Sequence, residues 1–194
     1  VGAVFHTAGV EPGSIVAVIG CGGVGLAAIN GAAIAGASMV IAVDMIDSKL
    51  ELAKAVGATH TINASSGNAV GEVIELTKGG CDYTFEAIGL KATAEQAFQM
   101  LASGGTATVI GMIPVGTMVE LHGVDFLMEK KIQGSNMGSN RFRIDMPRFI
   151  DFYLGGKLHL DQMISKHIKL QDVNTALDAL KTGEEARHVI MFDQ

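Results

Sequence analysis

The residues best suited to bind a ligand form a glycine-rich turn near the start of the chain. The letters GCGGVG occupy residues 20–25, after an apolar run and before an alanine-rich segment, so this G-x-G-x-x-G pattern ends one strand and begins one helix. In the fold that uses the pattern, Gly20 permits a tight turn, Gly22 lets a diphosphate approach the backbone, and Gly25 allows close packing of helix on strand. The N–H groups and partial positive charge of a helix N-terminus attract phosphates. The turn, with Gly23 and Val24 inside it, is therefore a predicted dinucleotide-binding site.

A carboxylate stands at the separation that such a site requires. Asp44 ends the second apolar run and lies 19 residues after Gly25, close to the ~20 residues at which an acid binds the adenosine ribose. The same carboxylate would repel the 2′-phosphate of NADP, so Asp44 favours NAD. Lys49 is a candidate for a second ribose contact or a solvated helix lysine. In the alternative interpretation of the motif, Gly22 and Gly25 serve packing alone and Asp44 caps the helix that begins near Ser48.

Short apolar runs alternate with segments of helical spacing through the first two thirds of the chain, as buried parallel strands and their crossover helices do. Such alternation specifies a parallel sheet, and six strands is the count of the dinucleotide-binding fold. The predicted fold class is α/β, a doubly wound six-stranded parallel sheet of the Rossmann type. The predicted strands are 15–19, 39–43, 60–62, 82–87, 106–110 and 131–134, and the predicted helices are 24–35, 48–56, 69–78, 92–102 and 123–129.

The glycine- and asparagine-rich segment 134–140 marks a change of rhythm. Beyond it we expect a helix over 146–154, a strand over 164–168, a helix over 173–181 and a strand over 188–192. The predicted dinucleotide-binding domain therefore spans residues 1–138, and residues 139–194 form a separate C-terminal segment.

Composition and charge exclude several functional classes. The 194 residues include 25 glycines and 48% apolar residues, and 20 acidic against 14 basic residues give a net charge of −6. This balance argues against a nucleic-acid partner. Residues 12–43 carry no charge, but the glycines divide them into pieces too short to cross a bilayer, so no membrane association is expected. Cys21 and Cys81 form no CxxC pair, which fits a reducing compartment and predicts a cytoplasmic protein.

Further motifs follow the glycine turn in order. They are DYTFEAIG at 82–89, the glycines at 104, 105 and 111, GSNMG at 134–138, and the segment 183–192 around Arg187. Together with residues 11–59, these stretches resemble the C-terminal, cofactor-binding half of the medium-chain, zinc-type alcohol dehydrogenases. The resemblance covers nearly the whole chain and implies a Rossmann fold that binds NAD.

The resemblance also implies further cofactor contacts, made largely through backbone groups. In that family the residues that match 87–89, 110–112 and 135–137 line the adenosine and nicotinamide pockets, and the arginine that matches Arg187 touches the diphosphate. Taken alone, Arg187 can equally be a solvated charge, and segment 134–140 a connecting turn. The implied contacts are Ala87, Ile88, Gly89, Ile110, Gly111, Met112, Ser135, Asn136, Met137 and Arg187.

The resemblance assigns catalysis to residues outside this sequence. In zinc-type enzymes the catalytic zinc is held by cysteine, histidine and an acid of an N-terminal domain, which would precede Val1. The six histidines here show neither HxxxH nor HxxC spacing. We therefore expect no catalytic and no metal-binding residue in this chain, zinc only in the catalytic domain, and little activity from the chain alone. Cys21 is interpreted as a packing side chain, and Glu86 as structural rather than as a general base.

Two surfaces are expected to need partners. The segment from Thr117 to His122 alternates polar and apolar residues like an edge strand, and in the resembling enzymes this edge joins two sheets across a twofold axis, which implies a homodimer. In the family, the part that follows the sixth strand returns to the catalytic domain, so apolar side chains beyond residue 139 should be exposed. Examples are Phe149, Phe152, Leu154, Leu177 and Leu180.

The favoured function is the NAD-binding part of a zinc-type alcohol dehydrogenase, which transfers hydride between a small alcohol or aldehyde and NAD. Two alternatives stay open: a stand-alone module that binds NAD without catalysis, and a zinc-free quinone or enoyl reductase of the same superfamily. Gly20, Gly22 and Asp44 argue against the reductase, since such enzymes more often carry AxxGxxG turns and prefer NADP. The substrate itself stays open among formaldehyde adducts, aryl alcohols and simple alcohols.

Overall fold

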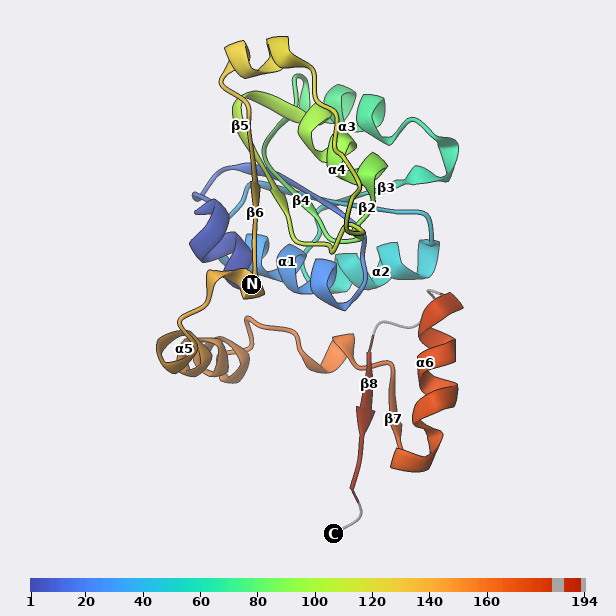
Figure 1. Ribbon diagram of the computed structural model, residues 1–194. Helices are drawn as coiled ribbons and strands as arrows, with labels where there is room; N and C mark the ends of the chain where they lie inside the picture. Colours follow the sequence, from blue (N-terminus) through green and yellow to red (C-terminus); the bar gives the residue numbers. More distant parts are fainter. Residues whose placement is uncertain (183–186, 193–194) are drawn as a thin grey trace.

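The computed structural model describes residues 1–182 and 187–192, and its largest element is a six-stranded parallel sheet (Figure 1). The strand order is β3-β2-β1-β4-β5-β6, so the chain crosses from one side of β1 to the other after β3. Such a reversal creates a crevice at the carboxyl ends of the two central strands, where ligands bind in this class of fold. The predicted α/β architecture is confirmed. The strands are β1 Ile15–Ile19, β2 Met39–Asp44, β3 His60–Asn63, β4 Cys81–Glu86, β5 Leu101–Val109 and β6 Lys131–Gly134.

Helices cover both faces of the sheet because alternate residues of each strand point to opposite sides. The helices are α1 Gly23–Ile34, α2 Asp47–Ala55, α3 Ala69–Thr77 and α4 Lys91–Gln99. Val16 and Val18 of β1 belong to the core that includes α1 and α2. Ala17 and Ile19, the intervening residues, belong to the core that includes α3 and α4. The sheet therefore has two dry faces, which explains why its strands read as continuous apolar runs.

Several predicted boundaries and one helix type were wrong. The helix predicted over 92–102 ends at Gln99 and the strand predicted over 106–110 begins at Leu101, because Leu101 already pairs with Cys81 and extends β5 beyond a register shift. The helix predicted over 146–154 begins earlier, at Phe142, where the N–H of Arg141 donates to Asp145 Oδ2 at 2.6 Å and stabilises an additional first turn. Residues 123–129 form the 3-10 helix η3 Gly123–Met128 rather than an α-helix.

The N-terminus forms a helix that the pattern did not indicate. The π-helix η1 Ala3–Ala8 packs against α1, where a Cβ on Gly31 would lie 3.1 Å from Cα of Val1. The small residues of α1 thus serve packing against the N-terminus as well as against the sheet. Other short 3-10 helices are η2 Ala64–Ser66, η4 Met137–Ser139, η5 Asp161–Met163 and η6 Leu170–Asp172.

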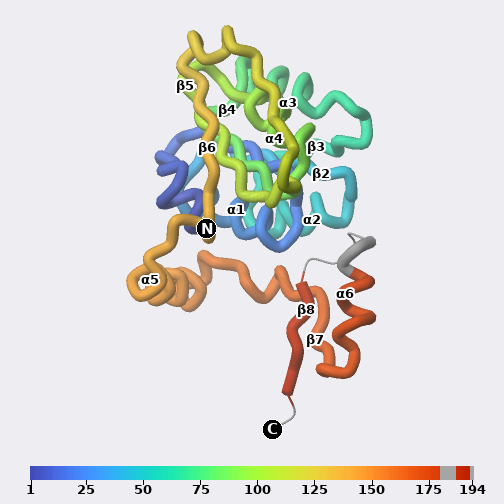
Figure 2. The backbone as a smooth tube through the Cα atoms, in the orientation of Figure 1, coloured from blue at the N-terminus to red at the C-terminus, as the bar shows by residue number. Residues whose placement is uncertain are grey.

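The C-terminal part contains its own small sheet. The helix α5 Phe142–Leu154 leads to the strand β7 Lys166–Ile168, the helix α6 Val173–Thr182 and the strand β8 His188–Ile190, which pairs in parallel with β7. Figure 2 shows this part leaving β6 and lying apart from the six-stranded sheet. As expected, Leu154 and Leu177 are exposed, whereas Phe149 and Phe152 are half-buried. The side chain of Leu180 lies outside the described residues.

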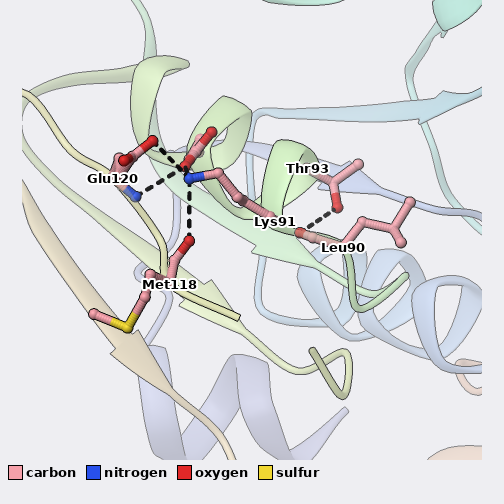
Figure 3. Close-up of polar contacts among 6 residues, drawn as sticks. Leu90, Lys91, Thr93, Met118 and Glu120 are labelled. Atoms are coloured by element: carbon pink, nitrogen blue, oxygen red, sulfur yellow. Dashed lines mark hydrogen bonds and ion pairs between the residues drawn. The ribbon is translucent and has the colours of Figure 1, made fainter. Parts of the chain in front are cut away.

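Residues 117–122, expected as an edge strand, pair with no strand of the described chain. They are held instead against α4. The Nζ atom of Lys91 lies 2.8 Å from Glu120 Oε2, 2.9 Å from Glu95 Oε1 and 3.1 Å from the carbonyl oxygen of Met118 (Figure 3). The backbone N–H of Glu120 donates to Glu95 Oε1 at 2.8 Å. Within the described chain, these side-chain contacts rather than a strand ladder hold the segment.

In the part of the chain that the structure describes, no helix combines the length and the apolar composition that crossing a membrane requires.

Candidate functional site

The glycine turn lies at the carboxyl end of β1, and its glycines have different surroundings. Gly20 has a φ of +93°, which favours glycine, and a Cβ there would lie 2.5 Å from Cγ1 of Ile88. At Gly25 a Cβ would overlap the carbonyl oxygen of Gly20, so α1 packs on the turn only without a side chain. At Gly22 a Cβ would meet no atom within 4 Å. Gly22 therefore borders open space, into which a ligand can approach the backbone.

The helix α1 begins directly beside this open space. Its N-cap residue, Gly22, provides no capping side chain, and no acidic residue lies in the first turn. The N–H of Leu26 donates to the carbonyl oxygen of Gly22 at 2.8 Å. The N–H groups before Leu26 thus precede the first hydrogen bond of the helix, and the positive end of its dipole is uncompensated. This end of α1 favours an anion such as a diphosphate.

Asp44, at the end of β2, is joined to the turn. Its Oδ2 atom accepts a hydrogen bond from the N–H of Cys21 at 2.7 Å, and its Oδ1 atom accepts from Met45 at 2.8 Å and Ile46 at 3.1 Å. The carboxylate is therefore oriented by backbone donors from two segments before any ligand arrives. It stands at the sequence separation from the turn that a ribose-binding acid requires.

Two cavities flank the turn. The first, which we call the Asp44 cavity, has a volume of about 470 Å³ and a mostly apolar lining to which Asp44, Lys49 and Thr93 contribute. The second, the Ser135 cavity, has a volume of about 470 Å³ and is lined by residues of the turn, the β5 end, the 135–138 loop and Arg187. Gly20 and Gly22 line the first cavity, and Gly23 and Val24 line the second. The turn therefore borders both cavities, as a diphosphate that joins two nucleosides requires.

The loop that borders the Ser135 cavity is held by the N-terminal helix. The hydroxyl group of Thr7 hydrogen bonds with the hydroxyls of Ser135 at 2.7 Å and Ser139 at 2.8 Å. The carbonyl oxygen of Thr7 accepts from Nε2 of Gln133 at 3.0 Å. Met137, Gly138 and Ser139 all have positive φ angles, so the loop is a tight left-handed bend. Thr7, near the start of the chain, thus holds a wall of the Ser135 cavity whose residues follow it by more than a hundred positions.

The structure gathers most of the predicted binding residues around these two cavities. The Asp44 cavity contains Gly20, Gly22, Asp44, Lys49, Ala87 and Ile88, and the Ser135 cavity contains Gly23, Val24, Ile110, Ser135, Asn136, Met137 and Arg187. Four predicted residues, Gly25, Gly89, Gly111 and Met112, line neither of these cavities.

Those four residues have other surroundings. A Cβ on Gly111 would overlap the N–H of Gly89, and a Cβ on Gly89 would lie 2.7 Å from the carbonyl oxygen of Met112. Gly25, Gly89 and Gly111 are therefore sites of close backbone approach. The side chain of Met112 is 91% exposed.

Several lining residues were missed by the sequence analysis. Thr93 and Gln96 of α4 line the Asp44 cavity, and Val1, Gly2 and Phe142 line the Ser135 cavity. Thr93 and Gln96 follow the end of the motif at 82–89 by four and seven residues, about one and two helical turns, so helical spacing was a usable signal for them. No local signal exists for the other three, since they reach the cavity only through tertiary contacts.

Neither thiol near the sheet has the environment of a nucleophile. Burial, with the nearby Asp44 carboxylate, raises the pKa of Cys21 to about 12, and burial with Asp82 raises the pKa of Cys81 to about 12. A thiol with so high a pKa stays protonated at neutral pH and is inert. The side chain of Cys21 is fully buried and packs in the core beneath the turn.

The described residues do not fit a zinc ion. Within residues 1–182 and 187–192, no three histidine, cysteine, aspartate or glutamate side chains are grouped as metal ligands would be. Structural and catalytic zinc sites both require at least three such protein ligands.

Comparison with known proteins adds sequence relatives. A family model described as zinc-binding dehydrogenase matches residues 23–154. The chain is 36% identical to alcohol dehydrogenase class-3 of Cereibacter sphaeroides, over 99% of this chain and 54% of that protein. It is 35% identical to S-(hydroxymethyl)glutathione dehydrogenase of Paracoccus denitrificans, over 99% of this chain and 53% of that protein. The chain thus spans about half the length of the curated relatives it matches.

Solved structures show the same fold. Benzyl alcohol dehydrogenase from Acinetobacter calcoaceticus superimposes with a TM-score of 0.95 at 32% identity, over 99% of this chain and 53% of that one. A zinc-binding dehydrogenase from Sinorhizobium meliloti 1021, solved bound to NADP, superimposes with a TM-score of 0.82 at 32% identity, over 91% of this chain and 51% of that one.

Proposed function

The chain belongs to the zinc-binding dehydrogenase family, and from this premise we propose that it is the NAD-binding half of an alcohol dehydrogenase. The observation that carries the proposal is the position of the turn 20–25, which lies at the switch point of the sheet and borders both the Asp44 cavity and the Ser135 cavity. A dinucleotide is the ligand whose two nucleosides and central diphosphate match such an arrangement.

The residues of the site fit this cofactor. The backbone at Gly22 leaves open space beside the N-terminus of α1, which suits a diphosphate. The carboxylate of Asp44, already oriented by Cys21, would accept hydrogen bonds from ribose hydroxyls in the Asp44 cavity. The Ser135 cavity would hold the nicotinamide, and Arg187, which lines this cavity, would make a charge-assisted contact to phosphate. Lys49 would add a second contact on the ribose side.

We propose that NAD is preferred to NADP, although a relative from S. meliloti was solved with NADP. A 2′-phosphate beside Asp44 would meet a like charge in a partly desolvated cavity, which costs several kcal/mol. We expect NAD to bind at least tenfold more tightly than NADP by calorimetry. In the variant Asp44→Ser this ratio should shrink, whereas Glu51→Gln, at an exposed position of α2 outside the cavity lining, should leave it unchanged. Equal affinities in the wild-type chain would contradict the proposal.

For the whole enzyme we propose oxidation of a small alcohol, or the reverse reduction of an aldehyde. Zinc held by another part of the protein would polarise the substrate oxygen while the nicotinamide accepts hydride. The residues described here would orient the cofactor and exclude water from one side of it. The chain alone should bind NAD yet turn over little or no alcohol, even with added zinc. Robust zinc-dependent turnover by the isolated chain would overturn this division of labour.

We also propose a homodimer, in the cytoplasm, that forms through residues 117–122. This segment is held against α4 by Lys91 (Figure 3). Met118 in the segment and Val115 just before it are exposed apolar side chains. An unpaired extended segment beside exposed apolar residues suits pairing with a second copy. Light scattering at micromolar concentration should give twice the mass of the chain, and a monomer mass would contradict the assignment.

The proposed location in the cytoplasm is supported by the two cysteines, which are buried and free, as is usual for proteins of a reducing compartment.

A further inference from the structure

A buried carboxylate lies at the end of β4. Glu86 is completely buried, and the next residue along the chain, Ala87, lines the Asp44 cavity. Burying an ionisable side chain is unfavourable unless its partners compensate for the lost hydration. An apolar residue could be buried at this position without that loss of hydration. The hydrogen-bond partners of Glu86 therefore indicate what its carboxylate does.

One oxygen of this carboxylate collects three donors. The Oε1 atom of Glu86 accepts from the N–H of Gly89 at 2.7 Å, from the N–H of Ile88 at 2.9 Å and from the hydroxyl of Thr93 at 2.7 Å. The same hydroxyl lies 3.0 Å from the carbonyl oxygen of Leu90 (Figure 3). Ile88, Leu90 and Thr93 all line the Asp44 cavity. Glu86 does not line that cavity itself, but its hydrogen bonds hold residues that form one wall of it.

The remaining atoms of Glu86 contact the neighbouring strand. Its carbonyl oxygen accepts from the N–H of Ile110 at 2.8 Å and of Gly111 at 3.1 Å. A Cβ on Gly111 would lie 2.6 Å from Oε2 of Glu86 and would overlap the N–H of Gly89. Among the described residues, Oε2 has no hydrogen-bond partner. The side chain is thus wedged between two turns, one after β4 and one after β5, that approach closely only because both contain glycine.

We propose that Glu86 is a positioning residue for the dinucleotide, which couples the walls of the two cavities. Through Oε1 its side chain fixes Ile88 and Thr93 on the adenosine side, and its Oε2 atom lies beside Gly111, the neighbour of Ile110 in the lining of the Ser135 cavity. Glu86 lines neither cavity, so it acts through these neighbours and not on the ligand itself. This inference rests on the proposed function, because the positioned ligand is NAD.

Two variants and one matched control separate this role from a purely structural one. Thr93→Val removes the hydroxyl that donates to Glu86 but keeps the shape of the side chain, and Thr93→Ser keeps the hydroxyl. Glu86→Gln keeps an acceptor but removes the charge that strengthens all three hydrogen bonds. Far-UV circular dichroism and a thermal scan identify the temperature at which every variant is folded.

The measurement is the dissociation constant of three probes, AMP, ADP-ribose and NAD, by competition against NADH fluorescence. We expect Thr93→Val to weaken all three by the same factor, about fivefold, since only the adenosine side is changed. Glu86→Gln should weaken AMP about tenfold, because the hydrogen bonds to Oε1 lose the charge of their acceptor, and NAD by more than AMP, because the Oε2 position beside Gly111 changes as well. Thr93→Ser should stay within about twofold of the wild type for every probe.

The outcomes distinguish the two proposals. A wild-type chain that binds none of the probes overturns the proposed function and the role of Glu86 together. A wild-type chain that binds NAD while folded Thr93→Val and Glu86→Gln bind it equally well overturns only the role of Glu86. Should Glu86→Gln fail to fold, the comparison of Thr93→Val with Thr93→Ser decides: a loss in the first that the second restores supports the role, and equal affinities overturn it.

Discussion

The six-stranded sheet region and the C-terminal region differ in how completely they bury their apolar side chains. In the sheet region, residues 15–134, strands such as β1 are covered on both faces, and Val16 and Val18 are completely buried. In the C-terminal region, from residue 139 onward, Leu154 is 75% exposed and Leu177 is 54% exposed. Its two strands form a sheet too small to enclose a core.

This difference indicates which region folds through its own contacts. The sheet region, joined by Ala3, Val4 and Val10 of the N-terminal segment, contains both hydrophobic clusters of the described chain, and Met163 is the C-terminal residue in one of them. Exposed apolar side chains on the scale seen in the C-terminal region mark surfaces that pack against something else. We therefore retain the proposal that residues 1–138 are the dinucleotide-binding domain and that residues 139–194 complete a surface with another part of the protein.

The largest predicted effect comes from comparing the same substitution, leucine to alanine, in the two regions. Leu26→Ala removes a completely buried side chain beneath the turn and should lower the free energy of unfolding by about 2–5 kcal/mol. Leu154→Ala, in the exposed part of α5, should change it by less than about 0.5 kcal/mol. Urea unfolding followed by circular dichroism measures both. Equal losses would show that the C-terminal region is as tightly packed as the sheet region.

A smaller effect separates stability from binding within the sheet region. Gly25→Ala forces a Cβ onto the carbonyl oxygen of Gly20 and should lower the free energy of unfolding by about 1–3 kcal/mol. Gly22→Ala places its Cβ in open space and should cost less than about 1 kcal/mol.

Binding should distinguish the same two variants in the opposite sense. Folded Gly22→Ala should bind NAD about tenfold more weakly, since its Cβ occupies the space of the diphosphate. Calorimetry with NAD is the measurement. Unchanged NAD affinity in Gly22→Ala would favour the interpretation in which these glycines serve packing alone.

A further predicted effect concerns the pH dependence of stability and again belongs to the sheet region, which holds both thiols. Their pKa values are raised from 9.0 to about 12 in the folded state, so the unfolded chain loses protons first as the pH rises. Stability should therefore fall between pH 9 and pH 12, by about 1.4 kcal/mol per pH unit for each thiol. Below pH 9 the thiols contribute no slope.

Substitution identifies the thiols as the source of that slope. The variant Cys21→Ala should lose half of the thiol contribution, and Cys21→Ala with Cys81→Ala should lose all of it, as measured by urea unfolding at several alkaline pH values. A slope that persists in the double variant would assign the effect to other groups, such as Tyr83, whose pKa burial also raises.

The sequence alone sufficed for whatever depends on neighbours along the chain. The apolar run that became β2, the glycine pattern at 20–25 and the acid at position 44 are local signals, and they predicted the sheet and the turn and carboxylate that line the two cavities. Boundaries were less predictable, since Leu101 joined β5 only because Cys81 offered a strand partner.

The tertiary structure alone decided the walls of the cavities. Val1 and Gly2 border the Ser135 cavity because η1 packs on α1, and Thr7 holds Ser135 across 128 positions of sequence. The donors that surround Glu86 and the absence of a strand partner for residues 117–122 within the described chain are likewise products of packing. Local patterns report the backbone conformation that a segment favours, whereas such contacts exist only after distant segments have been brought together, and no spacing of residue types along the chain encodes which groups will then meet.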